Sequence, residues 1–453
     1  MLILAAGLGT RMKSRRAKVL HELGGHPLIA YVARKARELN PRTIYVVVGH
    51  QAAEVEEAVR NALGTEADAP VFVMQEEQRG TGHAVMAASE HLKKSDSKLL
   101  VLSGDVPLVR LETLQTLVEH HLANRAACSI LSVKLENPTG YGRMVRNEAE
   151  GFSQIVEQKD ATPEQKLIRE INSGIYCFDT SKLVRALENI KPVNAQGEYH
   201  LTDAPGVLAA EGENISIYLH NDAREVSGIN TRADLAEFEN LLRRSTIRGL
   251  MLEGVTFIDP SHVYISGDAK IGCDCVIYPD VMIEGKTIIG EACTIRSGTR
   301  ITNSKLGSSV TVKDHCVVVD SEIESNCTIG PFAHLRMNTR LEQGSAIGNF
   351  VEVKKSRLGR GSKSMHLTYL GDATIGEGTN IGAGTITCNF DGKNKHETVI
   401  EDNVKIGSDT MLVAPVKVGS GAVTGAGSVV TRDVPPNSLV AGVPAEVKKK
   451  LKS

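Results

Sequence analysis

The chain has 453 residues, 41% of them hydrophobic, and its 52 Lys and Arg residues nearly balance 54 Asp and Glu residues. A chain of this length exceeds one ordinary hydrophobic core, so we expect two domains. The net charge of -2 gives no support for binding to nucleic acid or to a membrane surface. No apolar segment reaches the roughly 18 residues of a spanning helix, which argues against membrane insertion.

The eight cysteines are scattered without a CxxC pair. Cys273 and Cys275 are too close in sequence for a comfortable disulfide and lack partners for zinc. With no signal-peptide layout at the start of the chain, we expect reduced packing cysteines in a cytoplasmic protein.

The first expected element is a short apolar strand that runs into a Gly-rich turn, within LILAAGLGTRM at 2–12. Glycine in an opening strand–helix turn lets backbone approach a ligand, which is often a phosphate. The stretch is not a P-loop, because no Gly-Lys-Ser/Thr follows. It is not a dinucleotide fingerprint either, because Met12 stands where the third Gly would be. The turn therefore predicts a phosphate site of another kind, with Arg11 built into it.

Up to about residue 230, apolar strands alternate with helical patterns. Ile44–His50 and Leu99–Asp105 are typical of buried parallel strands, while helical periodicity runs over 29–36 and Ala52–Leu63. This alternation predicts an α/β domain with a mostly parallel sheet. Ligands of such sheets bind beyond the carboxyl ends of the strands, where both the opening turn and Asp105 are expected to lie.

An amphipathic helix follows, with apolar residues at Leu235, Phe238, Leu241 and Leu242 and an N-cap arrangement of Thr231 and Asp234. It is expected to rest on a neighbouring surface and to join two domains. The predicted division is a first domain at 1–232, a linker helix at 233–253 and a second domain at 254–453.

From about Gly254 an aliphatic residue recurs every six positions, often followed by Gly. A period of six fits neither a helix nor a two-faced strand, but it is typical of a parallel β-helix in which three segments close one coil. The segment 388–398 interrupts the pattern and is expected to protrude as a loop. The repeated residues, with one-residue slips between the runs, are Ile265, Ile271, Ile277, Ile283, Ile289, Ile295, Ile301; Ile329, Leu335, Leu341, Ile347, Val353; Ile400, Ile406, Leu412 and Val418.

LAAGLGTRM at 4–12 followed by Lys18 resembles the signature of sugar-phosphate nucleotidyltransferases. The hexapeptide repeats with HLTYLGD and NIGAGTITCNFDG resemble bacterial hexapeptide acetyltransferases. Together, over essentially the full chain, they resemble the family of bifunctional N-acetylglucosamine-1-phosphate uridyltransferases/glucosamine-1-phosphate N-acetyltransferases. The resemblance implies a Rossmann-like α/β nucleotidyltransferase domain and a left-handed parallel β-helix.

Nucleotidyl transfer spreads charge over phosphate oxygens, so it needs donors, cations and a divalent metal more than a covalent group. Arg11 and Lys18 suit the triphosphate, and Asp105 suits Mg²⁺ because hard cations prefer carboxylate oxygen. Taken alone, an Asp at a strand end is more often a turn former or helix cap. The resemblance implies a metal ligand there and adds Asn230 as the second metal contact. It places UTP and UDP-N-acetylglucosamine at Leu4, Ala5, Ala6, Gly7, Lys18, Gln75, Gly80, Thr81, Ser103, Gly104, Asp105, Gly142, Glu157, Asn172 and Asn230.

Acetyl transfer from acetyl-CoA requires a base that removes a proton from the attacking amine, and His is well matched to this near neutral pH. A lone His on a β-helix face is normally a surface residue, but the resemblance makes His366 the general base, with Glu352 as its orienting partner. It places glucosamine-1-phosphate at Arg336, Lys354, Tyr369 and Asn380. It places acetyl-CoA at Ala383, Asn389, Phe390, Ser408 and Ala426.

The chain departs from the common family pattern at four positions. Leu8 stands where many relatives carry Lys, and Ala17 stands where Pro usually precedes the lysine, which is expected to loosen the loop. Phe390 replaces a common Tyr and keeps stacking but loses a hydroxyl. Val443 replaces an Arg that often contacts the cofactor. These changes bear on rate and affinity more than on the reaction.

The leading prediction is a bifunctional enzyme that acetylates glucosamine-1-phosphate and then transfers UMP from UTP to N-acetylglucosamine-1-phosphate. We expect a homotrimer whose acetyltransferase sites lie between subunits. A second reading is a sugar-phosphate nucleotidyltransferase whose β-helix serves only assembly or regulation. A third is a non-catalytic assembly protein that keeps both folds. His366 and its cationic neighbours argue against the second reading, and Arg11, Lys18, Asp105 and Asn230 argue against the third.

Overall fold

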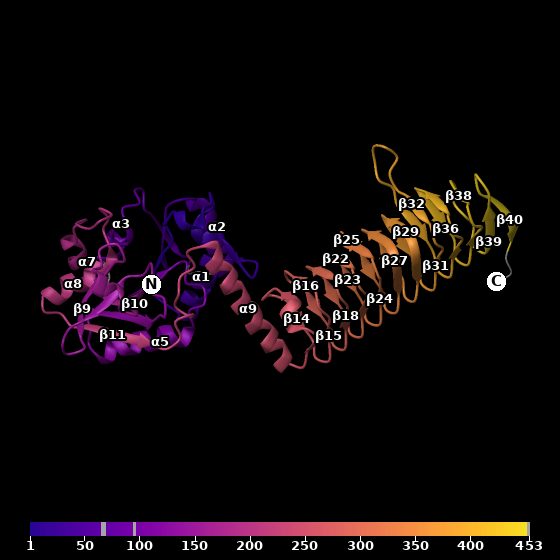
Figure 1. The fold of residues 1–453 in the computed structure, drawn as a ribbon. Coiled ribbons are helices and arrows are strands. Elements are labelled where there is room, and N and C mark those ends of the chain that lie inside the picture. Colours follow the sequence, from indigo (N-terminus) through magenta and orange to yellow (C-terminus); the bar gives the residue numbers. More distant parts are fainter. Residues whose placement is uncertain (65–68, 94–96, 451–453) are drawn as a thin grey trace. The chain divides into compact units, whose positions relative to one another are not determined.

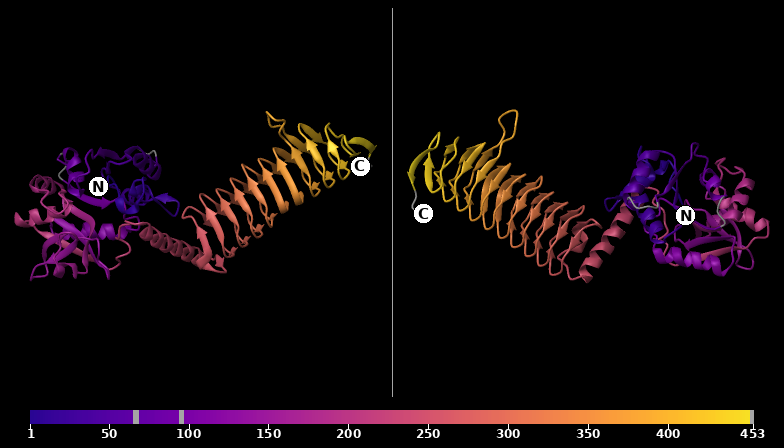
Figure 2. Two further views of the ribbon diagram at one scale, coloured as in Figure 1. Left: turned by 45° about the horizontal axis from the view of Figure 1, so that its top comes forward. Right: turned by 180° about the vertical axis from the view of Figure 1, so that it is seen from behind.

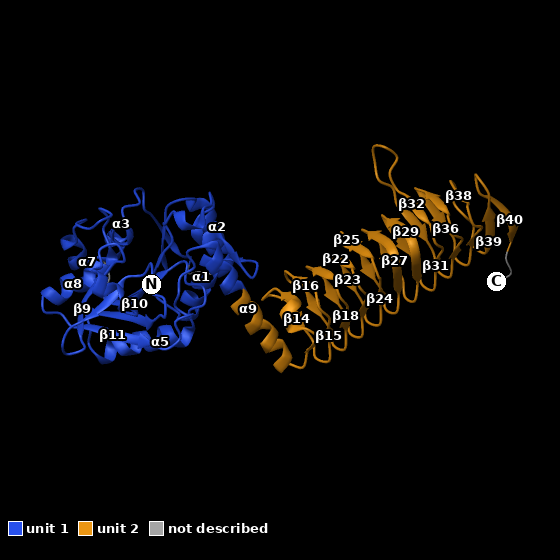
Figure 3. Ribbon diagram, in the orientation of Figure 1, with its two compact units in different colours: residues 1–239 blue, residues 240–453 orange. Residues whose placement is uncertain are grey.

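The computed structural model describes residues 1–64, 69–93 and 97–450 and forms two compact units, Met1–Glu239 and Asn240–Ser453 (Figure 3). The boundary between the units falls inside helix α9, Arg232–Leu252, which spans nearly the segment expected as a linker. Each unit has its own hydrophobic core. No helix in the described part of the chain is both long enough and apolar enough to cross a membrane.

The N-terminal unit is built on one twisted sheet in the order β11-β7-β10-β6-β1-β4-β5 (Figure 1). All neighbours on this path pair in parallel except β10, which runs antiparallel to both β6 and β7. The mostly parallel α/β sheet is therefore confirmed. The strands are β1 Leu2–Leu4, β4 Tyr45–Val48, β5 Val71–Met74, β6 Lys98–Ser103, β7 Cys128–Lys134, β8 Arg143–Arg146, β9 Phe152–Val156, β10 Glu170–Asp179 and β11 Ile215–His220.

The helices of this unit bury the apolar positions that their periodicity predicts. In α1 the residues Ile29, Val32, Ala33 and Ala36 are buried, and α2 has the expected bounds, Ala52–Leu63. Both helices pack on the sheet through one large apolar cluster. The helices are α1 Leu28–Glu38, α2 Ala52–Leu63, α3 Thr81–Ala87, α4 Ser89–Leu92, α5 Leu111–Ala123, α6 Pro163–Lys166, α7 Thr180–Asn189 and α8 Ala204–Ala210.

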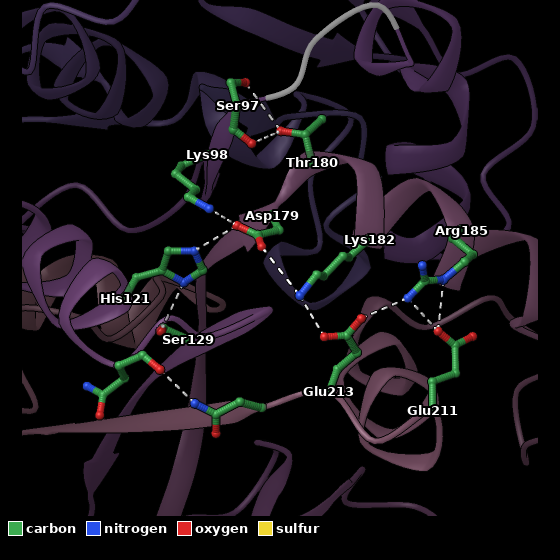
Figure 4. A network of polar contacts seen from close by, with 12 residues as sticks. Ser97, Lys98, His121, Ser129, Asp179, Thr180, Lys182, Arg185, Glu211 and Glu213 are labelled. Atoms are coloured by element: carbon green, nitrogen blue, oxygen red, sulfur yellow. Dashed lines mark hydrogen bonds and ion pairs between the residues drawn. The ribbon is translucent and has the colours of Figure 1, made fainter.

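A network of charged side chains ties strands and helices together at the amino end of β6 (Figure 4). Asp179, the last residue of β10, binds Lys98 of β6 and lies 3.4 Å from Nε2 of His121 on α5. Burial opposes ionisation of Asp179, but the contacts with Lys98 and His121 outweigh it and lower its pKa. Because Asp105 follows the opposite end of β6, this network is a structural brace remote from the predicted phosphate site.

The C-terminal unit is a parallel β-helix, whose strands stack coil upon coil (Figures 1 and 2). Before the protruding loop, most strands pair with one that lies seventeen or eighteen residues later, as Ile271 with Ile289 and Leu306 with Ile323. Across the loop the offset is twenty-five residues, as between Ile375 and Ile400. Every residue of the predicted six-residue repeat is buried in one continuous core, so the repeat is confirmed. One face has nine strands: β14 Lys270–Ile271, β17 Ile288–Ile289, β20 Lys305–Leu306, β23 Glu322–Ile323, β26 Arg340–Leu341, β28 Arg357–Leu358, β30 Ala373–Ile375, β33 Thr398–Ile400 and β36 Val416–Val418.

A second sheet, running from β12 to β40, forms the remaining sides of the coils. Its strands from the first coils are β12 Thr256–Phe257, β13 Val263–Ile265, β15 Val276–Ile277, β16 Val281–Glu284, β18 Thr294–Ile295, β19 Arg300–Thr302, β21 Thr311–Val312, β22 Val317–Val319, β24 Thr328–Ile329 and β25 His334–Arg336. The strands that follow are β27 Ala346–Lys354, β29 Lys363–Gly371, β31 Asn380–Ile381, β32 Ile386–Cys388, β34 Lys405–Ile406, β35 Met411–Val413, β37 Val423–Thr424, β38 Val429–Val430, β39 Ser438–Ala441 and β40 Glu446–Lys450.

Small polar side chains inside the corners satisfy backbone groups that the turns would otherwise leave without partners. Thr299 Oγ1 donates to Lys313 O at 3.0 Å and accepts from Cys316 N at 3.4 Å. Cys275 Sγ donates in the same way to Gly290 O. All eight cysteines are free thiols; six are buried, Cys388 is half-buried and Cys273 is exposed. Burial raises the pKa of Cys316 to about 11, so this thiol is a packing residue.

Two local predictions are confirmed at the level of individual contacts. Asp234 Oδ2 accepts from the backbone N of Asn230 and of Thr231, while Thr231 Oγ1 accepts from Asp234 N, so these side chains cap α9. The segment 388–398 leaves the coil as a protruding loop between β32 and β33 (Figure 1).

Candidate functional site

The opening loop turns sharply after β1 because its glycines permit backbone positions that other residues disfavour. Gly9 has φ +63°, and a Cβ there would lie 2.4 Å from Lys18 Cβ. A larger residue at Gly9 would therefore displace Lys18. A Cβ on Gly7 would meet nothing within 4 Å, which leaves the backbone on that side open to a ligand.

Four polar side chains from distant segments meet beside this loop. Lys18 Nζ donates to Asp105 Oδ2 and, at 3.1 Å, to Asn230 Oδ1. Arg11 Nη2 donates to the same Asn230 oxygen at 2.8 Å. The side chains of Lys18 and Asp105 are only 17% and 15% exposed. Two cations and two hard oxygens thus converge at the carboxyl end of the sheet, where the sequence places the triphosphate and Mg²⁺.

The backbone around this cluster is fixed by contacts between neighbouring strand ends. Gly104 N donates to Leu4 O, and Ala5 N donates to Val47 O, each at 2.9 Å. Ala6 O accepts from Gln78 Nε2 at 2.8 Å. A Cβ on Gly104 would lie 2.9 Å from Ile29 Cδ1 and 3.1 Å from Leu4 O, so glycine suits the close approach of this turn. Ser103 is the last residue of β6 and lies beside Gly174.

The residues expected at the uracil lie together around the start of α3. Gln75 is buried and donates through Nε2 to Gly80 O at 3.2 Å. Gly80 has φ +102°, and a Cβ there would be 2.5 Å from Tyr199 O, so only glycine fits. Thr81 Oγ1 accepts from Leu201 N at 3.0 Å, which ties this turn to the segment after α7.

The residues expected at the sugar form a second small group. Asn172 N donates to Gly142 O at 2.9 Å, and a Cβ on Gly142 would lie 3.2 Å from Glu157 Oε1. Burial raises the pKa of Glu157, against the lowering effects of His200 and of the hydrogen bond from Thr202. Asn172, Gly142 and Glu157 therefore lie at one place, with a carboxyl group that resists ionisation.

The donor set fits a Mg²⁺ ion that is held mainly by substrate phosphates. Within residues 1–64, 69–93 and 97–450 no group of three or more His, Cys, Asp and Glu could hold a metal. Asp105 and Asn230 nevertheless direct carboxylate and amide oxygens at one cation, the Lys18 ammonium. Magnesium is commonly bound by one or two such groups together with phosphate oxygens.

In the β-helix, His366 lies exposed on β29 beside the neighbouring strand β27. Its register partner is Asn349, and His366 Nδ1 lies 2.9 Å from Asn349 Oδ1. An amide oxygen accepts, so Nδ1 carries a proton, and in the neutral form of the imidazole the lone pair is on Nε2. Glu352 instead accepts from Arg336 Nε at 2.8 Å. The strand register thus carries Asn349 to the imidazole, while the expectation that Glu352 orients His366 stays a prediction.

Three of the four residues expected at glucosamine-1-phosphate lie side by side on successive coils. Arg336 pairs in register with Lys354, and Glu352, two residues before Lys354, pairs with Tyr369. Lys354 is buried, with its Nζ 3.8 Å from Asp372 Oδ2. Asn380 is different, because it pairs with Lys363 and so lies on the far side of His366 from Tyr369.

The protruding loop adds a third cation to this region. The nearby ammonium of Lys354 lowers the pKa of Lys395, which indicates that two cations share one place. Asn389 Nδ2 donates to Asp372 Oδ2 at 2.5 Å. Within the loop, Phe390 and Lys395 pair through their backbones in an isolated antiparallel β-bridge. The Phe390 side chain is 59% exposed and available for stacking.

The remaining residues expected at acetyl-CoA form a column along successive coils. Asp409 N donates to Ala383 O at 2.7 Å, and Gly427 N donates to Ser408 O at 2.8 Å. Ala383, Ser408 and Ala426 therefore occupy equivalent positions on successive coils, twenty-five residues apart across the protruding loop and eighteen residues apart after it. Val443 is 73% exposed, and its side chain supplies no donor.

The sequence reasoning missed Asn349, Asp372 and Lys395. Asn349 stands seventeen residues before His366, which is one coil, so counting back by a coil from His366 would have found it. Lys395 had no such signal, because it lies in a loop whose path the repeat does not set. Asp372 ends the HLTYLGD motif but was given no role.

Comparison with known proteins decides the family. The chain is 48% identical over 438 residues to the bifunctional protein GlmU of Syntrophomonas wolfei, covering 97% of this chain and 96% of that protein. The bifunctional GlmU proteins of Geobacillus sp. (strain WCH70) and Heliobacterium modesticaldum are also 48% identical, each over 97% of this chain and 94% of the relative. The chain belongs to the GlmU family.

Family models match both halves of this GlmU-family chain. A MobA-like NTP transferase domain matches residues 1–172, and the bacterial transferase hexapeptide (six repeats) matches residues 397–432. A GMPPB C-terminal domain matches residues 260–341. Among solved structures, UDP-glucose pyrophosphorylase complexed with UDP-glucose is 18% identical at a TM-score of 0.44, over 54% of this chain and 98% of that one.

Proposed function

We propose that the chain is a bifunctional enzyme of UDP-N-acetylglucosamine synthesis. Its β-helix acetylates glucosamine-1-phosphate with acetyl-CoA, and its α/β unit transfers UMP from UTP to N-acetylglucosamine-1-phosphate, releasing pyrophosphate. Near-full-length similarity to bifunctional GlmU proteins supports two activities. The observation that carries uridylyl transfer is the convergence of Arg11, Lys18, Asp105 and Asn230.

For uridylyl transfer, the chain's own residues bind and orient the triphosphate. Arg11 and Lys18 neutralise phosphate oxygens, and backbone N–H groups of the opening loop donate to them. The sugar phosphate attacks the α-phosphate in line as pyrophosphate leaves. Asp105 and Asn230 would hold Mg²⁺, which supplies further positive charge to the phosphates when bound. Gln75 and the turn at Gly80 hold the uracil, while Glu157 and Asn172 hold the sugar.

For acetyl transfer, His366 Nε2 accepts the proton that the substrate amine loses as it attacks the thioester carbonyl. Asn349 keeps the proton on Nδ1, so that Nε2 presents its lone pair. Arg336 and Lys354 bind the sugar phosphate, with Tyr369 and Asn380 bonding the sugar. Ala383, Asn389, Phe390, Ser408 and Ala426 line the path of acetyl-CoA.

The assembled form is proposed to be a homotrimer in the cytoplasm. His366 and Tyr369 lie on an outer face of the coils, so a second subunit is needed to enclose the amine and thioester. Beside His366 runs an exposed apolar column in which Phe332 and Phe350 stack at 5.3 Å and Leu367 is 63% exposed. This column suits burial against another copy of the chain.

The test supplies glucosamine-1-phosphate, acetyl-CoA, UTP and Mg²⁺ and follows free thiol and pyrophosphate separately. Release of both, with pyrophosphate release dependent on prior acetylation, is expected. A protein that releases pyrophosphate from UTP and N-acetylglucosamine-1-phosphate but never free thiol would support the alternative, a sugar-phosphate nucleotidyltransferase with a β-helix for assembly or regulation.

The division into 1–232, a linker helix at 233–253 and 254–453 is proposed with one test. A fragment ending at Arg232 lacks Asp234, which accepts from the backbone of Asn230 and Thr231. A fragment ending at Glu239 keeps it. Both are expected to release pyrophosphate and no thiol, with the longer one more active. A soluble, folded longer fragment without pyrophosphate release would contradict the division.

A further inference from the structure

Gln51 stands at the first turn of α2 in an unusual backbone conformation. It occupies the N-cap position with φ 54° and ψ 45°, in the left-handed region that residues other than glycine seldom adopt. Its side chain makes no capping bond to its own helix. Asn, Asp, Ser, Thr and Gly are the usual residues at such a position, so Gln51 gives up local stability. The reason for this lies elsewhere in the fold.

The side chain of Gln51 reaches the opening loop instead. Its Oε1 accepts from Ala17 N at 2.6 Å, across thirty-four residues of sequence. Ala17 is fully buried, so its N–H would otherwise have no water to bind. The preceding residue makes a parallel contact, because His50 Nε2 lies 3.1 Å from Arg15 O and must donate to it. Two consecutive residues of the β4–α2 turn thus hold the backbone of the loop at 15–17.

The held segment ends directly before Lys18. The Lys18 ammonium is bound by Asp105 and Asn230, so its reach depends on where the backbone at Ala17 is fixed. We propose that Gln51 is a positioning residue for uridylyl transfer, acting through the Ala17 backbone on Lys18; this inference rests on the proposed function. Ala17, which stands where Pro is usual, supplies the N–H that Gln51 binds.

The geometry at Ala17 offers a rescue test in the full-length protein. Its φ of -55° suits proline, which has no N–H. Gln51→Met removes the acceptor and leaves the buried N–H without a partner, so kcat/KM for UTP is expected to fall about tenfold. Adding Ala17→Pro removes that N–H, and the double variant is expected to return to within about threefold of wild type.

The matched control is Glu54→Met, which changes an exposed side chain on the same helix and is expected to leave both activities unchanged. Acetyl transfer is expected to stay at wild-type level in all variants. A folded Gln51→Met protein with normal kcat/KM, or a loss that Ala17→Pro does not reverse, would overturn the inference. Wild-type protein that releases no pyrophosphate would instead overturn the proposed function.

Discussion

The two candidate sites hold their polar side chains in opposite ways. In the α/β unit, Arg11 and Lys18 of the opening loop bind Asp105 and Asn230 from two other loops, across as many as 219 residues of sequence. In the β-helix, Arg336, Lys354 and Tyr369 stand side by side on successive coils, and the side chain of Asn349 is the partner of His366.

The difference follows from how each fold exposes its strand ends. A parallel sheet with connecting helices brings several loops to one edge, and the loops can close around a ligand. A β-helix coil has short turns and presents outer faces, so that side chains form rows and columns. The first site is prearranged within one chain, whereas the second is proposed to be completed by another subunit.

The largest effect is expected from Asp105→Ala. The change removes the carboxylate that binds Lys18 and would hold Mg²⁺, so pyrophosphate release should fall to background. Acetyl transfer, measured as free thiol in the same preparation, should remain near wild type. Equal loss of both activities in a folded protein would contradict the independence of the two sites.

His366→Ala is expected to lower acetyl transfer by roughly 10²–10⁴-fold, the usual contribution of a positioned general base. Uridylyl transfer and acetyl-CoA binding should be unchanged, and the wild-type pH profile should show activity in the unprotonated form. His366→Asn serves as the control for packing. A stable His366→Asn protein with near-normal turnover would show that the imidazole only packs against its neighbours.

Asn349→Ala sharpens the assignment of the partner of His366. Loss of the acceptor at Nδ1 frees the imidazole to change tautomer, so kcat for acetyl transfer is expected to fall about tenfold. Glu352→Gln should act differently, raising KM for the sugar phosphate through Arg336. The reverse pattern, with kcat sensitive to Glu352 alone, would favour Glu352 as the orienting residue.

The smallest effect concerns pH and Glu157. Burial raises its pKa in the folded state, so the stability it contributes is present at low pH and is lost as pH rises through the folded pKa. Glu157→Gln keeps an oxygen for Thr202 without the charge. Its Tm should match wild type at low pH and exceed it by about 1–4 °C near neutrality. Melting curves of both proteins across pH test this. The transition to follow is the one whose Tm rises on addition of UTP, because UTP is proposed to bind the α/β unit. A Tm difference between variant and wild type that does not change with pH would contradict the prediction.

Much of the fold follows from the sequence alone. The six-residue repeat determines the β-helix core, because every repeated aliphatic side chain points into the interior of a coil and is buried there. The bounds of α2 and the cap made by Thr231 and Asp234 are local matters of periodicity and hydrogen bonding, and both were predictable. The opening Gly-rich motif led to Lys18, and the end of the apolar strand at 99–105 led to Asp105.

Only the tertiary structure decided which of these residues bind one another. Lys18 meets Asp105 and Asn230 because sheet order brings their loops to one edge, and no spacing in the sequence encodes that contact. His366 meets Asn349 because a coil of seventeen residues fixes the register. The side chain of Gln51 binds the backbone N–H of Ala17 and makes no capping bond to its own helix. Local helix preferences disfavour this arrangement, and the burial of the Ala17 N–H explains it.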